Sequence, residues 1–329
     1  MSGACCVPGD ERHGTDDGAD HGADDGGPGL ALDAVPEGGG SPPDTMVDVP
    51  ASAFRMGDDS VWAYPGDGEG PVHDVTLDAF RIDRHAVTND AFTGFVKATG
   101  WVTEAERFGW SFVFSGLLPD GFGDTRGVVG AEWWRQVFGA DWRHPEGPQS
   151  GVDTRGDHPV VHVSWHDAQA YCRWTGTRLP TEAEWECAAR GGRAGTAFPW
   201  GDDLEPGGEH RMNVFQGSFP DRDTGVDGFV GTAPVDAFPP NDLGLHNVTG
   251  NVWEWCADWF DVDTYARRES VNPHGPEHGD HRVQRGGSYL CHLSYCRRYR
   301  VSARYGSEPT SSTGNTGFRV AADPLTPTP

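Results

Sequence analysis

Two cysteines, Cys291 and Cys296, stand five positions apart in the stretch SYLCHLSYCRRYR. This spacing puts the side chains on opposite faces of a strand, or about 140° apart on a helix, so the sulfurs meet only if the HLSY segment bends. Two thiolates can form a redox disulfide or bind a soft ion such as Cu(I), but they are too few for a closed zinc site. The alternative is that both are ordinary buried cysteines.

The segment around the cysteine pair is basic in a strongly acidic chain. Residues 281–307 hold six arginines and no Asp or Glu, whereas the whole chain has 50 Asp+Glu against 25 Lys+Arg and a net charge of −25. Positive charge beside a thiol favours the thiolate, the form that attacks electrophiles and binds metals. We therefore expect a positive pocket around the thiols; the alternative is that the arginines pair with distant carboxylates.

Oxygen-rich loops are the other candidate for metal chemistry. MNVFQG (212–217) precedes DTGVDGF (223–229), and NVTGNVWEW (247–255) follows downstream. Ca²⁺ takes six to eight oxygen ligands, including carboxylates, amides and backbone carbonyls. Asn213 with Asp227, and Asn247 with Glu254, could each bracket one ion. Spacing alone favours the alternative that these residues form Asx turns, because the chain has no EF-hand loop.

Charge and hydropathy exclude several classes of protein. The acidic balance argues against nucleic acid as a partner, and no apolar run approaches the length of a membrane span. The N-terminus lacks the pattern of a secretory signal, so we expect a cytoplasmic protein without a membrane. Residues 1–44 are acidic and Gly-rich, with runs such as TDDGADHGADDGG, and are predicted to form a disordered tail.

The elements that must position these groups are few and short. Capping residues and apolar spacing predict helices over 87–100, 164–176 and 181–190, and alternation predicts strands over 73–83 and 317–323. Long Gly/Pro/Trp loops connect them, which indicates functional or metal-ordered loops. The sequence predicts one α+β domain over 45–325.

Several segments together resemble a known family, the formylglycine-generating enzymes or sulfatase-modifying factors, in its bacterial cytoplasmic type. The matching strings include RLPTEAEWE (178–186), GNVWEW (250–255) and, most specifically, GGSYLCHLSYCRRYR (286–300). The resemblance covers 45–325. It implies a C-type-lectin-like α+β fold with little regular secondary structure, stabilised by calcium, and a catalytic domain over 45–325.

The resemblance also implies an activity. Members oxidise the cysteine of a Cys-x-Pro-x-Arg motif in an unfolded or nascent sulfatase to Cα-formylglycine, using O₂, copper and a thiol reductant. Carried over, Cys291 and Cys296 bind Cu(I), and Ser288, Tyr295 and Trp253 line the pocket beside it. The expected partners are thus a sulfatase chain, O₂ and a thiol, and we expect a monomer.

The remaining site residues are implied by position. One calcium ion would use Asn213, Val214, Asp227 and Phe229, and a second Asn247, Gly250, Val252 and Glu254. The peptide groove would use Ala105, Trp110, Ser111, Phe112, Trp133, Ser312, Thr313 and Asn315. Trp110 departs from members with an acid there that could pair with the substrate arginine; Glu104 or Glu106 is the expected substitute.

Cysteine usage fits the cytoplasmic type. Secreted members pair a cysteine at position 172 with one at position 320, which is Val320 in this chain, and carry another where Ala189 stands. Cys172, Cys187 and Cys256 are therefore expected to be packing residues. Two alternatives remain: a non-catalytic lectin-like module that binds a peptide or ligand, and a relative of the iron-dependent sulfoxide synthases, which use a histidine triad.

Overall fold

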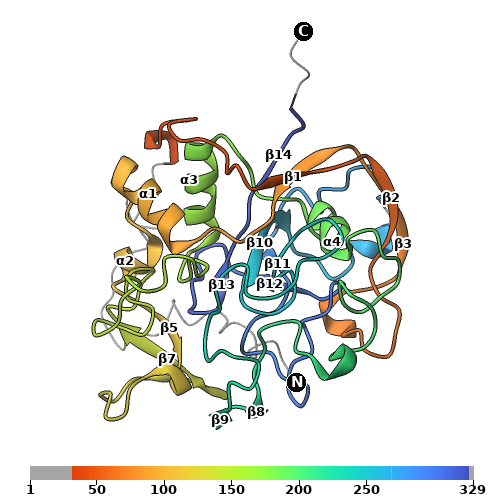
Figure 1. Cartoon of the computed structure of the whole chain (residues 1–329). Coiled ribbons are helices and arrows are strands. Elements are labelled where there is room, and N and C mark those ends of the chain that lie inside the picture. The colour runs from red at the N-terminus through yellow and green to blue at the C-terminus, as the bar shows by residue number, and fades with distance from the viewer. Residues whose placement is uncertain (1–31, 268, 326–329) are drawn as a thin grey trace, which may run out of the picture.

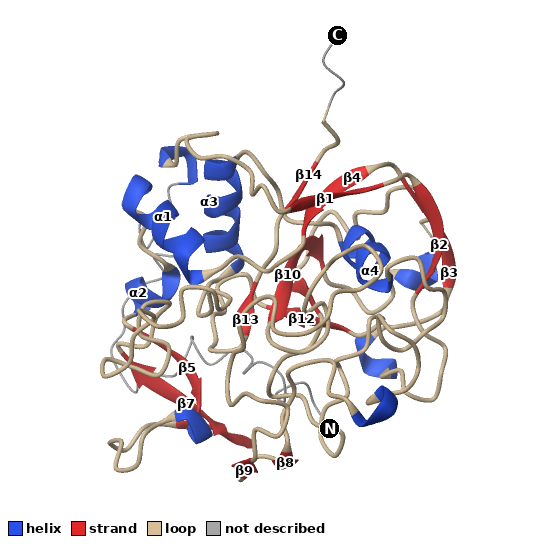
Figure 2. Cartoon of the chain, in the orientation of Figure 1, coloured by secondary structure: helices blue, strands red, loops and turns tan. Residues whose placement is uncertain are grey.

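The computed structural model describes residues 32–267 and 269–325, and loops make up most of it (Figures 1 and 2). The α-helices are α1 (Asn89–Thr99), α2 (Glu104–Phe108), α3 (Trp165–Thr175) and α4 (Glu182–Arg190). Short 3-10 helices are η2 (Leu32–Ala34), η3 (Pro65–Asp67), η4 (Ser115–Leu117), η5 (Pro206–Gly208) and η6 (Tyr265–Arg267). Within these ranges, no helix is long and apolar enough to cross a bilayer.

Each α-helix begins and ends where the local chemistry requires. A Ser or Thr side chain caps every N-terminus, and a glycine in the left-handed region ends every helix. The three predicted helices are confirmed. Helix α2 was not predicted, although Thr103 and Glu106 form the same capping box as Thr181 and Glu184.

The strands form several small sheets. The largest has the order β12-β11-β10-β13, and others are β1-β4-β14, β5-β7-β6, β2-β3 and β8-β9. Their bounds are β1 (Met46–Val49), β2 (Ser52–Met56), β3 (His73–Leu77), β4 (Phe80–Asp83), β5 (Trp110–Phe114), β6 (Gly127–Val128), β7 (Ala131–Phe138), β8 (Gly217–Ser218), β9 (Arg222–Asp223), β10 (Trp253–Trp259), β11 (Arg282–Arg285), β12 (Arg304–Ser307), β13 (Thr316–Gly317) and β14 (Ala321–Ala322). The predicted strand 73–83 is divided into β3 and β4, and 317–323 contains β14.

The central sheet separates two apolar cores. Helices α1 and α3 pack together on one side, while α4 lies beside β2 and β3 on the other (Figure 1). Neighbouring residues of β10 serve both: Trp255 packs with α1 and α3, and Cys256 packs with α4. The small sheet of β5 and β7 stands apart from this centre, on the side toward which residues 288–296 turn.

Residues 32–44 differ from the prediction. They were assigned to the disordered tail, but they pack on α3: the backbone N–H of Gly38 donates to the carbonyl of Arg173 (3.1 Å), and that of Gly40 to Trp174 (2.8 Å). Val35 is only 4% exposed in the core of α1 and α3. The apolar residues Leu32 and Val35 give this segment surface to bury against α1 and α3. Residues 1–31 lie outside the described residues.

Candidate functional site

The two cysteines meet in a tight bend. The sulfurs of Cys291 and Cys296 lie 3.6 Å apart, and both residues are buried, at 2% and 1% exposure. The N–H groups of Tyr295 and Cys296 donate to the carbonyl of His292 (2.9 and 2.8 Å), which closes the bend of the HLSY segment that the sulfurs need in order to meet. The two cysteines are not joined in a disulfide.

Backbone contacts on either side fix this bend. The N–H of Phe215 donates to the carbonyl of Cys291 (3.0 Å), and the N–H of Tyr289 donates to Asn251 (2.9 Å). Gly287 has φ +72°, and a Cβ there would lie 2.7 Å from the carbonyl oxygen of Arg298. Only glycine permits both this conformation and this close approach, which lets the chain leave β11 and return alongside residue 298.

The expected positive pocket around the thiols is mostly wrong. Glu182 pairs with Arg285 (2.9 Å) and Arg304 (2.7 Å), and Glu69 pairs with Arg300 (2.7 Å). Arg282 lies against the rings of Trp165 and Trp259, and Arg297 against Trp62. These arginines compensate buried carboxylates or stack on aromatic rings. Arg298 pairs with Asp67 in the same way, but its Nη1 in addition lies 3.7 Å from the sulfur of Cys296.

The predicted pocket residues surround the cysteine pair. The backbone N–H of Ser288 donates to the sulfur of Cys291 (3.4 Å). The hydroxyl oxygen of Ser288 accepts from the Asn315 amide (2.9 Å) and from the N–H of Leu290 (3.3 Å). Trp253 is fully buried in the cluster that contains both cysteines, and its indole nitrogen has no hydrogen-bond partner among the described residues.

Aromatic rings lead from this pocket to the surface. Tyr295 is half-buried and stacks on Phe219, with ring centroids 4.5 Å apart, and Trp133 meets Tyr295 edge-on at 5.1 Å. Phe219 was missed in the sequence, because its ring reaches the site from a loop about 75 residues before the cysteines. These partly exposed rings form the open side of the candidate groove.

Most of the other predicted groove residues lie beneath the surface. Phe112 and Thr313 form a backbone bridge, and the Ser111 hydroxyl donates to the carbonyl of Ser312 (2.9 Å). The structure therefore brings these segments together, but five of the predicted residues have no exposed surface: Ala105, Ser111, Ser312, Thr313 and Asn315. They support the groove from below, whereas Trp110 and Trp133 are partly exposed.

Neither acid expected to replace the one missing at Trp110 is available. Glu104 is 7% exposed and lies 3.2 Å from the Nδ1 of His166. Glu106 caps α2 and pairs with Arg143. Both carboxylates serve local structure, and Trp110 presents an aromatic surface that meets Phe112 edge-on at 5.0 Å.

Residues predicted for the first calcium site lie close to one another. The carboxylate of Asp227 accepts from the N–H groups of Val214 and Phe229 (3.2 Å each), which brings three of the four expected residues together. Asn213 is next in the chain, and its amide nitrogen donates to the carbonyl of Gly231 (2.8 Å). Desolvation raises the pKa of Asp227, so burial of this charge is only partly compensated. A cation would compensate it.

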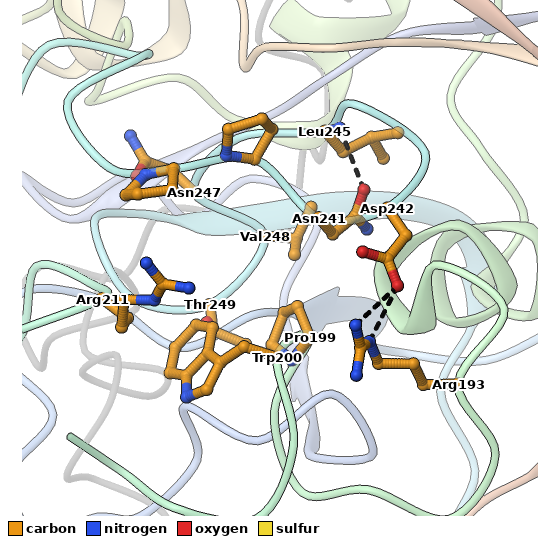
Figure 3. A pocket seen from close by; sticks show the side chains of 12 residues that line it. Arg193, Pro199, Trp200, Arg211, Asn241, Asp242, Leu245, Asn247, Val248 and Thr249 are labelled. Atoms are coloured by element: carbon orange, nitrogen blue, oxygen red, sulfur yellow. Dashed lines mark hydrogen bonds and ion pairs between the residues drawn. The ribbon is translucent and has the colours of Figure 1, made fainter. Parts of the chain in front are cut away.

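At the second predicted calcium site, Asn247 suits a cation but Glu254 does not. The side-chain oxygen of Asn247 is buried with no hydrogen-bond partner in the part of the chain that the structure describes, and Asn247 lies on the wall of a small pocket with Trp200 and Arg211 (Figure 3). An orphaned acceptor suits a cation. Glu254, however, is already paired with Arg319 (2.6 and 2.7 Å) and accepts from the indole of Trp185 (2.6 Å). Its charge is thus balanced without calcium.

The site is thus a pair of cysteine thiols at van der Waals distance, not joined in a disulfide, in a buried bend of an α+β domain dominated by loops. The chain matches the "Sulfatase-modifying factor enzyme 1-like domain" over residues 33–324. It is 57% identical over 284 residues to the "Formylglycine-generating enzyme" of Thermomonospora curvata, covering 85% of this chain and 94% of the relative. The chain belongs to this family of sulfatase-modifying, formylglycine-generating enzymes.

The chain is also similar to a relative named as inactive and to a solved structure. The chain is 46% identical over 282 residues to the "Inactive C-alpha-formylglycine-generating enzyme 2" of Bos taurus, covering 84% of this chain and 87% of the relative. Among solved structures, PvdO from Pseudomonas aeruginosa is similar with a TM-score of 0.61 at 30% identity, over 85% of this chain and 94% of that chain. The α+β fold expected from the sequence is confirmed, while family membership alone leaves activity to be decided at the site.

Proposed function

We propose that this chain is a copper-dependent oxidase that converts the cysteine of a Cys-x-Pro-x-Arg motif in an unfolded sulfatase to Cα-formylglycine. We further propose that it works as a monomer in the cytoplasm. The observation that carries the proposal is the cysteine pair, two buried sulfurs held 3.6 Å apart and not joined in a disulfide. Packing cysteines would not require an inward bend fixed from both sides.

The donor set suits Cu(I). The sulfurs are farther apart than the roughly 2.05 Å of a disulfide and lie together in one buried cluster. Thiolates are the soft ligands that Cu(I) prefers, and two of them leave room for a substrate thiolate. When bound, Cu(I) would supply the redox chemistry toward O₂.

The side chains around the pair have defined tasks. Both acceptor positions of the Ser288 hydroxyl are used, so its proton remains to be donated to a group bound beside Cys291. The rings of Tyr295, Phe219 and Trp133 cover the approach and exclude water. In the overall reaction, the substrate CH₂SH and O₂ take two electrons and two protons from an external thiol and yield an aldehyde, sulfide and water.

We also propose two structural calcium ions. The partly compensated carboxylate of Asp227, with Asn213 and the carbonyls of Val214 and Phe229, supports the first. The orphaned oxygen of Asn247 supports the second, with Gly250, Val252 and Glu254. Because Glu254 is balanced by Arg319, the first site is expected to bind more tightly.

The direct test is conversion of a peptide. The protein is incubated with a Cys-x-Pro-x-Arg peptide, Cu(I), a thiol and air, and mass spectrometry follows the change from cysteine to formylglycine. A peptide with serine in place of the cysteine is the matched control. Conversion that requires copper and the cysteine peptide supports the proposal. Binding of the peptide without conversion would instead favour a non-catalytic module.

A further inference from the structure

The contact between Arg298 and the cysteine pair has no counterpart among the neighbouring arginines. Its Nη1 lies 3.7 Å from the sulfur of Cys296, and the residue is 6% exposed. A guanidinium is permanently charged and donates hydrogen bonds in a fixed plane. An N–H directed at a thiolate stabilises the negative charge on that sulfur.

Arg298 is held in this position from two sides. Its Nε and Nη2 donate to the two oxygens of Asp67 (2.5 and 3.0 Å), which fixes the plane of the guanidinium. The ring of Tyr64 lies 4.5 Å from its central carbon. Two of its nitrogens are therefore committed to Asp67, and the third is the one that faces the sulfur.

The loop that carries Asp67 and Tyr64 is itself fixed. Glu69 accepts from both terminal nitrogens of Arg300 (2.7 and 2.8 Å) and from the N–H of Tyr64 (3.0 Å). Gly68 has φ +64°, and a Cβ there would lie 2.2 Å from the carbonyl oxygen of Val262, so the loop is pressed against the body of the protein. This rigid support is more than a surface ion pair would need.

We propose that Arg298 tightens metal binding by the cysteine pair through its hydrogen bond to the sulfur of Cys296, and that Asp67 and Tyr64 are positioning residues for it. The proposal rests on the proposed function, since it assumes that the pair binds Cu(I). Two thiolates and one Cu(I) carry a net negative charge in a buried site. A fixed guanidinium against one sulfur offsets that charge and makes Cys296 the more stabilised of the two donors.

The neighbouring residue supplies a matched control. Arg297 is adjacent in sequence, but its guanidinium lies 4.2 Å from the ring of Trp62, on the surface. Replacing Arg298 alone would leave Asp67 buried without its partner and could unfold the protein. The double variant Asp67→Asn with Arg298→Met removes both charges, and Arg298→Lys keeps the charge while losing the planar fork.

The test is the Cu(I) dissociation constant, measured by anaerobic competition with a chromophoric chelator, with thermal unfolding to show that each variant is folded. Loss of an outer-sphere partner typically weakens metal binding by about 10- to 100-fold, so the double variant should fall in that range. Arg298→Lys should retain part of the affinity, and Arg297→Met should match the unaltered protein. A folded double variant with unaltered Cu(I) affinity would overturn the role of Arg298. An unaltered protein that binds no Cu(I) would overturn the proposed function as well.

Discussion

The chain contains two kinds of buried thiol. Cys256 and Cys296 are 0% and 1% exposed, so burial does not distinguish them. Burial raises the pKa of Cys256 well above its usual value, and the charge of nearby Asp258 raises it further. Cys296 instead lies against the guanidinium of Arg298. The groups that face a sulfur, rather than its depth, distinguish an inert cysteine from one that can bind a metal.

Cys172 and Cys187 belong with Cys256. Burial raises the pKa of Cys172 to about 12 and also raises the pKa of Cys187. These three cysteines lie in the two main cores, packed among apolar side chains. We refer to them as the core thiols. The cysteine pair lies in a separate cluster, near the aromatic rings of the groove.

The largest effect is expected when one sulfur is removed from the cysteine pair and, in a separate variant, one from the core thiols. Cys291→Ala or Cys296→Ala should abolish Cu(I) binding at the pair and lower peptide conversion by at least about 1,000-fold, because two ligands are needed. Cys256→Ala should cost about 1 kcal/mol of unfolding free energy and leave conversion intact. Conversion assays and denaturant unfolding on the same proteins check both. A Cys291→Ala variant that still converts the peptide would remove the distinction.

A variant of Arg285 shows whether the other buried arginines act on stability alone, in contrast to the role proposed for Arg298 in copper binding. Arg285 is fully buried and pairs with Glu182 and Glu186. Arg285→Met leaves each of these buried carboxylates with a single arginine, Arg304 for Glu182 and Arg190 for Glu186, and should lower the unfolding free energy by about 3–5 kcal/mol. Urea unfolding measures this loss. Copper affinity of the folded fraction should be unchanged, and a fall in affinity without a fall in stability would show that the arginines act on the thiols as a group.

Calcium binding at Asp227 is expected to stabilise the backbone that supports the cysteine pair. Asp227 binds the backbone of Val214, and the next residue, Phe215, holds the carbonyl of Cys291. At a calcium concentration 100-fold above its dissociation constant, binding should stabilise the folded protein by about 2.7 kcal/mol. Melting curves with calcium and with a chelator should differ for the unaltered protein and less for Asp227→Ala. Identical curves for the unaltered protein would argue against calcium.

A smaller effect is expected on the pH dependence of stability, from the buried acid Asp258 near Cys256. Burial raises the pKa of Asp258 from 3.8 to about 8, with Glu182 adding to the shift. Between these values the folded state holds a proton that the unfolded state releases, so this group lowers stability as pH rises, by about 1.4 kcal/mol from pH 6 to 7. In Asp258→Asn this contribution is absent, and unfolding free energies at the two pH values should differ by less. An unchanged difference would mean that Asp258 titrates normally.

Helix boundaries could be predicted from the sequence, whereas ion pairs between distant segments could not. Caps and glycines predicted three helices, and the cysteine spacing showed only that the sulfurs meet if the HLSY segment bends, as it does in the structure. The partners of the arginines could not be predicted: Asp67 and Arg298 are 231 positions apart. An acid-free run in the sequence therefore suggested a positive pocket, while the fold supplies the missing carboxylates from distant loops.

In the candidate groove, too, contacts between distant segments could be predicted only in part. The family resemblance implied that these segments share a groove, and Phe112 and Thr313 form a backbone bridge. It did not indicate which side chains reach the surface, because that depends on how β5 packs over residues 311–315. Fully buried Ala105 and Ser111 are examples, and Phe219 is the ring that no local pattern marked.

The most direct test of the central claim is where copper binds. Crystals loaded with Cu(I) without oxygen, and measured at the copper absorption edge, would show the metal by its anomalous scattering. We predict one peak at the cysteine pair, within bonding distance of both sulfurs, and none at the core thiols. A peak elsewhere, or no peak in crystals whose Cys291 and Cys296 are reduced, would contradict the account.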